Sequence, residues 1–104
     1  MRKNDKNIAN AFNALSDKNR LKILLFIRKQ ECKCEENKFF CRNETCIKDL
    51  SKRLDITMPT ISHHIKELVT AGFITTKKEG KWVYCKINKE KFKNVNNFLN
   101  KFIN

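Results

Sequence analysis

The chain has 104 residues, enough for one hydrophobic core and too few for two, so we expect a single domain over residues 1–104. It carries 23 Lys and Arg against 11 Asp and Glu, a net charge of +12, which favours a polyanionic partner. Its longest apolar run, residues 23–27, is far shorter than the roughly 20 residues that span a bilayer. The first residues also lack the hydrophobic stretch of a secretory signal. We therefore expect a cytoplasmic protein that does not associate with membranes.

The first half of the chain predicts two helices. Only two glycines and one proline occur, which favours a mainly helical fold. Helical spacing predicts a first helix over about 7–15, from the apolar positions Ile8, Ala11, Phe12 and Leu15. Ser16 is a typical N-cap residue, and Asp17 after it favours the helix dipole. We expect a second, largely buried helix from there to about Gln30.

Two further helices follow a cysteine-rich segment. Helical spacing with Thr45 as cap predicts a third helix, from Ile47, Leu50 and Leu54. After a short turn, Thr57 is expected to cap a fourth helix with Pro59 in its first turn. Gly72 should end this helix at its C′ position. Its predicted apolar stripe is Ile61, Ile65, Leu68 and Val69. Two helices joined by so short a turn indicate a helix-turn-helix.

The C-terminal third predicts a hairpin and a last helix. Residues 73–87 alternate on either side of Glu79 and Gly80, which is typical of a two-stranded β-hairpin, or wing. A helix over about 89–103 would place five apolar residues on one face, namely Phe92, Val95, Phe98, Leu99 and Phe102. With the helix at 7–15, this face predicts homodimerisation; alternatively it completes the monomer core. The fold class is therefore α+β, mainly α: a winged helix-turn-helix of about five helices with a two-stranded wing.

The fourth helix and the wing carry the candidate residues for binding double-stranded DNA. Side chains early in such a helix read base edges in the major groove, for which we predict Met58, Thr60, Ser62 and His63. Lys66 is expected on a phosphate. The wing should meet the DNA backbone through lysines, chiefly Lys77, Lys78 and Lys81, with Lys86 beside them. Any amphipathic helix has a polar outer face, so this pattern indicates DNA binding only together with the predicted helix-turn-helix and wing. His64 lies nearer the apolar side and is expected to be packed and hydrogen-bonded.

Four of the five cysteines lie close together, and we predict them as ligands of a metal or metalloid ion: Cys32, Cys34, Cys41 and Cys46. Residues 31–45 have a net charge of −1, whereas the flanking segments are basic, so cations are favoured here. Thiolates suit thiophilic ions such as As(III), Cd(II), Pb(II), Zn(II) or Cu(I). Alternatives are a structural zinc, a redox-switched disulfide, or thiols without function. Cys85 alternates with apolar strand residues and is expected in the core.

The blocks "ALSDKNRLKIL", "DLSKRLDITMPTISHHIKEL", "AGFI" and "KKEGKWVYCKI" resemble the ArsR/SmtB family of winged-helix repressors, with one insertion at about 31–45. The resemblance implies a homodimer that binds operator DNA until a metal or metalloid effector lowers its affinity. Many members begin the helix before the recognition helix with Cys-x-Cys. Here Cys46 keeps the first cysteine, Lys48 replaces the second, and Ser51 stands where some arsenic sensors have a third. Another metal site of the family uses His and Asp on the last helix, which this chain lacks there.

The sequence therefore predicts a transcriptional repressor released from its operator by a thiophilic ion bound through cysteines. One alternative is a repressor of the same fold that responds to thiol oxidation or persulfides. Another is a metal-binding carrier or interaction module without DNA recognition. No nucleophile, base and orienting group occur together in a pattern that predicts an enzyme.

Overall fold

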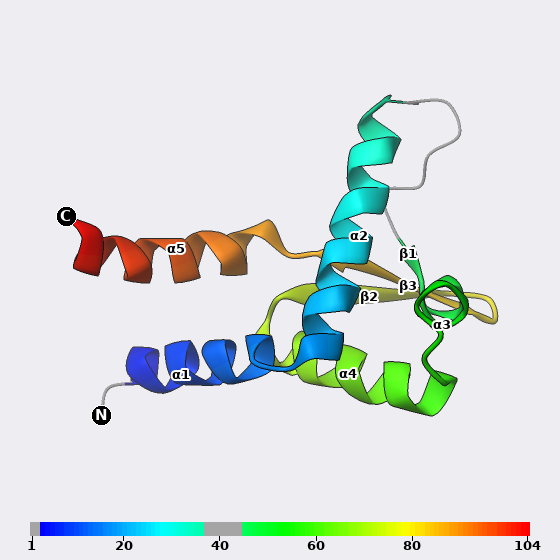
Figure 1. Cartoon of the computed structure of the whole chain (residues 1–104), viewed down its shortest axis with the longest axis horizontal. Helices are drawn as coiled ribbons and strands as arrows, with labels where there is room; N and C mark the ends of the chain where they lie inside the picture. Colours follow the sequence, from blue (N-terminus) through cyan, green and yellow to red (C-terminus); the bar gives the residue numbers. More distant parts are fainter. Residues whose placement is uncertain (1–2, 37–44) are drawn as a thin grey trace.

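The computed structural model describes residues 3–36 and 45–104, and the side chains of residues 5–30 and 45–104. Along the chain the elements are α1 (Lys3–Leu15), α2 (Lys18–Glu36), β1 (Thr45–Cys46), α3 (Ile47–Leu54), α4 (Met58–Ala71), β2 (Ile74–Glu79), β3 (Trp82–Ile87) and α5 (Lys89–Ile103). In Figure 1, α1 and α5 lie side by side at one end of the molecule, and the β2–β3 wing projects at the other, next to α3. None of the described helices is long and apolar enough to span a bilayer.

The sheet has three antiparallel strands in the order β1-β3-β2. The predicted hairpin is confirmed: β2 and β3 pair from Ile74 with Ile87 to Glu79 with Trp82, and Gly80 takes a positive φ of 59° in the two-residue loop. The third strand, β1, was not predicted. Thr45 lies in it, buried and paired with Cys85, and Cys46 is the N-cap residue of α3. The predicted capping role of Thr45 is therefore wrong, because the sheet takes up this residue.

The core joins the inner faces of the helices to the sheet. Its most deeply buried side chains are Ala11, Ile23, Ile27, Leu50, Ile61, Leu68, Phe73, Ile74 and Cys85. The expectation for Cys85 is confirmed, since it is 1% exposed and its Sγ donates a hydrogen bond to the Thr45 carbonyl at 3.3 Å. The predicted apolar stripe of α4 is also buried except for Val69, which is 39% exposed.

The start and end of α2 differ from the prediction. The Ser16 hydroxyl donates to the Asn13 carbonyl at 2.6 Å, closing the end of α1 instead of opening α2. Asp17 is the capping side chain: its Oδ1 accepts hydrogen bonds from the backbone N–H groups of Asn19 at 2.8 Å and Arg20 at 3.1 Å. At its other end α2 continues to Glu36 and not to about Gln30. Residues 31–36, predicted as part of a loop, are thus helical.

The end of α4 is fixed by Gly72, as predicted. Gly72 has a φ of 90°, which a residue with a side chain rarely adopts. Its N–H donates to the Val69 carbonyl, and the Phe73 N–H donates to the Leu68 carbonyl, both at 3.0 Å, which is the Schellman pattern. Asn88 then holds this end from the base of the wing, because its Nδ2 donates to the Gly72 carbonyl at 2.8 Å.

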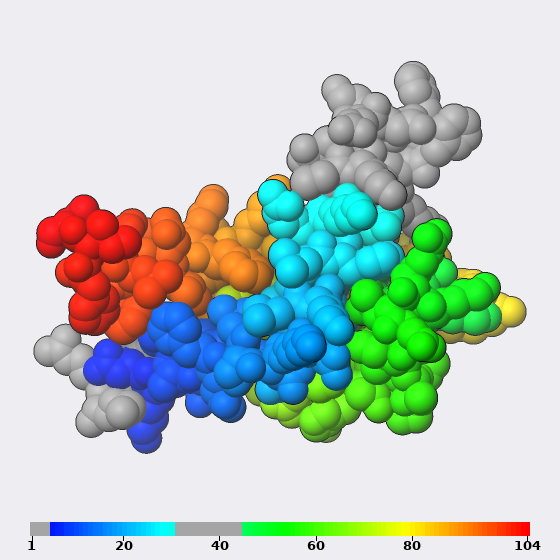
Figure 2. All heavy atoms as spheres, viewed as in Figure 1, coloured from blue at the N-terminus to red at the C-terminus, as the bar shows by residue number. Residues whose placement is uncertain are grey.

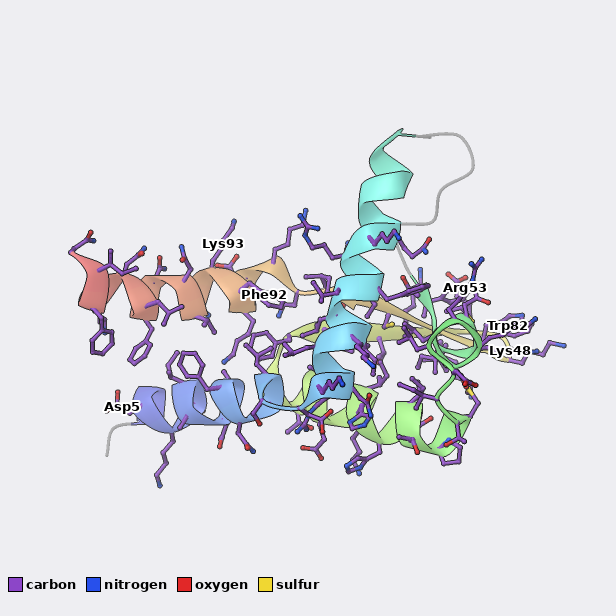
Figure 3. The ribbon with its side chains drawn as sticks, viewed as in Figure 1. Asp5, Lys48, Arg53, Trp82, Phe92 and Lys93 are labelled. Carbon is purple, nitrogen blue, oxygen red and sulfur yellow. The ribbon has the colours of Figure 1, made fainter. Side chains whose placement is uncertain are left out.

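Helices α1 and α5 form a joint apolar surface away from the wing. The rings of Phe12 and Phe98 lie 6.0 Å apart, and those of Phe98 and Phe102 lie 5.3 Å apart. Figure 2 shows these helices packed against each other, and Figure 3 shows aromatic side chains between them. Only part of this surface is covered, because Leu99 is 41% exposed and Phe102 and Ile103 are each 76% exposed. A large apolar area therefore remains accessible on one protomer.

Candidate nucleic-acid interface

The turn between α3 and α4 is built from local hydrogen bonds. Asp55 takes a left-handed φ of 54°, and the Ile56 N–H donates to the Ser51 carbonyl at 3.2 Å. The Ser51 hydroxyl donates back to the Ile56 carbonyl. Ser51 is thus occupied in holding the turn, and it offers a hydroxyl where some arsenic sensors resembling this chain have a thiol.

The next residues begin α4 and set the direction of its side chains. Thr57 is the N-cap residue, as predicted, but its side chain makes no capping hydrogen bond. Its Oγ1 instead donates to the Thr60 Oγ1 at 3.0 Å, and the Ile61 N–H donates to the Thr57 carbonyl. Pro59 stands in the first turn, where its missing N–H removes no helical hydrogen bond.

The faces of α4 divide as predicted. The buried side holds Ile61, His64, Ile65 and Leu68. All the side chains predicted to meet DNA from this helix are exposed, namely Met58, Thr60, Ser62, His63 and Lys66. They include two hydroxyls, an imidazole, an ammonium and one flexible apolar group, which together can donate, accept and contact base edges. An exposed helix face of this composition is suited to the major groove.

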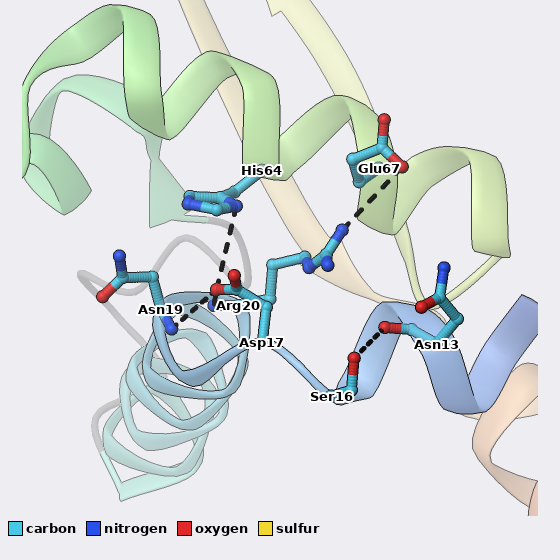
Figure 4. Close-up of polar contacts among 7 residues, drawn as sticks. All are labelled: Asn13, Ser16, Asp17, Asn19, Arg20, His64 and Glu67. Carbon is cyan, nitrogen blue, oxygen red and sulfur yellow. Dashed lines mark hydrogen bonds and ion pairs between the residues drawn. The ribbon is translucent and has the colours of Figure 1, made fainter.

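His64 lies on the inner side of α4, facing the start of α2. It is 9% exposed, which confirms its predicted packing. Its Nδ1 is 4.0 Å from Asp17 Oδ1 and has no hydrogen-bond partner among the described residues, so the predicted hydrogen bond is not found. Next to it, Arg20 Nη1 lies 3.8 Å from Glu67 Oε2 (Figure 4). The start of α2 thus contacts α4 through two polar pairs, Asp17 with His64 and Arg20 with Glu67.

The carboxylate of Asp17 lies at the centre of this contact and has a displaced pKa. The N–H donated by Arg20 holds the pKa of Asp17 below its ordinary value of 3.8, helped by the N–H of Asn19 and by the nearby charges of His64 and Arg20, while burial opposes the shift. Asp17 is therefore ionised over the neutral range, and it supplies the anion that faces α4.

The wing carries its predicted lysines on the surface. Lys78 and Lys81 are exposed, and Lys77 Nζ lies 3.0 Å from Glu79 Oε1. Lys81 follows Gly80 in the loop, and its Nζ lies 5.4 Å from the centroid of the Trp82 ring. The predicted lysines of the wing are thus on the surface, although Lys77 shares its charge with a carboxylate.

A surface pocket of about 340 Å³ lies where α3, α4 and the wing meet. Cys46, Ile47 and Lys48 line it from the start of α3, and the other lining residues are Met58, Ser62, Lys81, Trp82 and Val83. Lys48 Nζ lies 5.0 Å from the centroid of the Trp82 ring. This pocket places Cys46 beside two of the side chains predicted to enter the groove, Met58 and Ser62.

The four predicted metal ligands are not brought together within the described part of the chain. Cys46 is a free, partly exposed thiol. Cys32 and Cys34 lie on the last turns of α2, and their side chains are outside the description, as is all of Cys41.

Sequence reasoning missed several residues that position this surface. Asp17 was predicted only as an acid beside a capping Ser16, although aspartate is itself a preferred N-cap. Asn88 is likewise a favoured N-cap type before α5, but it bonds the end of α4 instead. Lys48 and Trp82 left no local signal of their contact, because they are brought together only by the pairing of β1 with β3.

The fold and the exposed face of α4 define a winged helix-turn-helix protein. Residues 38–76 match the family model described as "Bacterial regulatory protein, arsR family". The chain is 33% identical over 79 residues to the arsenical resistance operon repressor of Bacillus subtilis, covering 76% of this chain and 64% of the relative. It is 31% identical to that of Staphylococcus aureus, covering 80% and 67% of the two chains. This protein belongs to the ArsR family.

Other relatives extend the comparison. The cadmium resistance transcriptional regulatory protein CadC of Listeria innocua is 31% identical over 88 residues, which cover 85% of this chain and 64% of CadC. The match thus spans slightly under two thirds of the Bacillus and Listeria relatives. A crystal structure of an ArsR family transcriptional regulator superposes with a TM-score of 0.75 at 26% identity, covering 97% of this chain and 91% of the other. The homodimeric winged helix-turn-helix DNA-binding domain from Mycobacterium bovis has the same fold, with a TM-score of 0.68 at 17% identity over 90% and 76%.

Proposed function

We propose that this protein is a homodimeric, sequence-specific DNA-binding transcriptional repressor, released from its operator by a thiophilic metal or metalloid ion. The observation that carries the DNA-binding part is the division of α4. Ile61, Ile65 and Leu68 are buried, and the residues predicted to read DNA are all exposed. Lys81 of the wing lines one pocket with two of them, Met58 and Ser62. Base edges supply sequence information and phosphates supply affinity, so α4 would specify the operator and the wing would strengthen the hold.

The homodimer is supported by the surface of α1 and α5. Phe102 and Ile103 are each 76% exposed and Leu99 is 41% exposed, although their neighbour Val95 is buried and Phe98 is half-buried. Burying these side chains against a second copy would remove apolar area from water. Two-fold pairing would also present two α4 helices to half-sites about one helical turn of DNA apart, as dimeric helix-turn-helix proteins require.

The effector part rests on Cys46 and on the relatives. The Bacillus and Listeria relatives are named for arsenical and cadmium resistance. Candidate ions are As(III), Cd(II), Pb(II) and Zn(II), which when bound would draw thiolates together as soft ligands. Cys46 fits such a ligand because it is a free, partly exposed thiol. The other ligands proposed are Cys32, Cys34 and Cys41.

The position of Cys46 suggests how it would affect DNA binding. Cys46 is the N-cap residue of α3, pairs with Tyr84 of the wing, and lines the same pocket as Met58 and Ser62. A displacement of Cys46 toward the end of α2 would therefore move the start of α3 relative to α4 and the wing. Coupling between two such sites is typically about 1–3 kcal/mol.

The proposal is tested with reduced protein and labelled DNA from upstream of its own gene. Fluorescence anisotropy should detect binding to a short inverted repeat far above mixed genomic DNA. Adding As(III), Cd(II), Pb(II) or Zn(II) in turn should release the DNA together with the appearance of thiolate-to-metal absorbance. Cys46→Ser should weaken this release. Cys85→Ser is the matched control, because the same exchange is made at a buried thiol whose hydrogen bond to Thr45 a hydroxyl can keep.

The possible outcomes separate the alternatives. Release by an oxidant or persulfide but by none of the ions would favour a redox-responsive repressor. Ion binding without any preference for an inverted repeat would favour a metal-binding module and contradict the proposed function. Full release of Cys46→Ser by the ion that releases the unmodified protein would remove Cys46 from the mechanism.

A further inference from the structure

The ring of Trp82 has two ammonium groups close to it. Trp82 is the only tryptophan of the chain, opens β3, and is 37% exposed. Lys48 Nζ lies 5.0 Å and Lys81 Nζ 5.4 Å from the centroid of its ring, both within cation–π range. Lys48 comes from α3 and Lys81 from the loop of the wing, and Figure 3 shows Lys48 and Trp82 next to each other at this end of the molecule. The ring therefore gathers two charges from separate elements.

Among the residues whose side chains are described, no carboxylate pairs with either ammonium group, whereas Lys77 is paired with Glu79. Two cations held over one ring repel each other, and an anion between them would relieve this repulsion. The ring already restricts both lysine side chains. Binding an anion there would therefore cost less side-chain conformational entropy than binding one with two freely moving lysines.

The pocket beside these groups has the size and the setting for a phosphate. Its volume is about 340 Å³, and Ser62 of α4 contributes a hydroxyl to its lining. Ser62 and Met58 belong to the face of α4 proposed to enter the major groove. DNA in that position would bring its backbone past the mouth of the same pocket.

We propose that Lys48, Lys81 and Trp82 form a phosphate clamp that holds one backbone phosphate of bound DNA between α3 and the wing. The two lysines supply the charge, the Trp82 ring holds them in place, and the Ser62 hydroxyl is a further donor. This inference rests on the proposed DNA-binding function and adds Lys48 and Trp82 to it. It also gives Lys48 a role of its own at the position where family members resembling this chain have a second cysteine.

The clamp has a consequence for Cys46, which lines the same pocket. A phosphate in the clamp restricts access to the Cys46 thiol. Bound DNA should therefore slow the alkylation of Cys46 by iodoacetamide. The rate is measured by mass spectrometry of the peptide that contains Cys46. Binding of an ion at Cys46 and of a phosphate between Lys48 and Lys81 would oppose each other within this pocket.

The test compares Lys48→Gln with Lys93→Gln by anisotropy over a series of salt concentrations. Lys93 is an exposed lysine on α5, far from Lys48 (Figure 3), so the control has the same change in net charge. Each phosphate contact contributes a slope of about −0.9 to the logarithmic salt dependence. In the proposed homodimer Lys48→Gln removes two such contacts, so between 50 and 200 mM salt the variant should lose about 12-fold less affinity than the unmodified protein. Operator and random DNA should be affected alike, because phosphates carry no base identity.

A second variant separates the ring from the charge. Trp82→Leu keeps both lysines and should weaken binding with little change in the salt slope, and Trp82→Phe should restore most of the loss. Equal salt slopes for Lys48→Gln and Lys93→Gln, with unmodified protein still selecting its operator, would overturn the clamp alone. Failure of the unmodified protein to select any operator would instead overturn the proposed function. Thermal unfolding of each variant establishes that it is folded.

Discussion

Replacing Asp17 tests whether the start of α2 is stabilised as the structure indicates. Asp17→Ala removes the acceptor of two backbone N–H groups, those of Asn19 and Arg20, and the anion 4.0 Å from His64. Loss of such a cap costs about 0.5–2 kcal/mol. The Asp17 side chain is 35% exposed, so water replaces part of what is lost. We expect about 1 kcal/mol of lost stability, which lowers the Tm of a small domain by about 4–8 °C.

The measurement is urea unfolding followed by far-UV circular dichroism, with all variants at equal protein concentration because dimer stability depends on it. Asp17→Ala should lower the midpoint at an unchanged slope. Asp17→Asn keeps an acceptor oxygen and should cost much less. Asp5→Ala removes an exposed aspartate from α1 and is the control for charge. An Asp17→Ala midpoint equal to that of Asp5→Ala would show that the cap contributes nothing.

The same residue predicts a pH dependence. Because the folded pKa of Asp17 lies below its ordinary value of 3.8, the carboxylate stabilises the fold above that pH. This contribution is lost as the pH falls through the folded pKa, when the carboxyl group takes up a proton in both states. The stability difference between the unmodified protein and Asp17→Asn should therefore shrink below about pH 3.8. A difference that stayed constant to lower pH would contradict the assigned cause.

Three further predictions concern the fold, the dimer and the DNA surface. Gly72→Ala should destabilise by about 1–2 kcal/mol in urea unfolding, because a left-handed φ of 90° strains any residue with a side chain. Phe102→Ser should shift sedimentation equilibrium toward monomer, whereas Leu25→Ser, which changes an apolar residue 64% exposed on α2, should not. Lys66→Ala should weaken binding to operator and to random DNA alike. His63→Ala should weaken binding to operator DNA more than to random DNA, by about 1–3 kcal/mol for a lost base contact. Equal losses for the two DNAs would show that His63 contacts the DNA backbone.

Much of the helix-turn-helix could be predicted because its signals are local. Gly72 takes the positive φ that its residue type favours, and Pro59 stands where a first turn tolerates it. The spacing of Ile61, Ile65 and Leu68 fixed the buried side of α4, and hence which polar residues face outward. These features depend on residues within a few positions of one another, so a single sequence contains them.

The parts that were missed depend on contacts between distant residues. The strand β1 has only two residues, and Thr45 pairs with Cys85, forty positions later. No local pattern predicts such a strand. The extension of α2 had a weak local signal, since Glu31, Glu35 and Glu36 favour helix, but the cysteines among them pointed toward a ligand loop. The contact of Lys48 with Trp82 follows from the pairing of β1, and so it could not be anticipated either.

The structure offers two routes by which the cysteines could affect α4, and their lengths differ. Cys46 lines one pocket with Met58, so an ion bound to it would act on α4 directly. The path through α2 runs from Cys34 to the contact of Asp17 with His64, about 25 Å along the helix at 1.5 Å per residue. A tilt of α2 is needed for that path, whereas a small shift of Cys46 suffices for the other.

A double-mutant cycle of Cys46→Ser and Asp17→Asn distinguishes the two routes. The quantity measured is the change in operator affinity on adding the releasing ion. If the short route carries the effect, Cys46→Ser should abolish most of it and Asp17→Asn little, with no coupling beyond about 0.5 kcal/mol. A strong loss of response in Asp17→Asn alone would assign the coupling to α2.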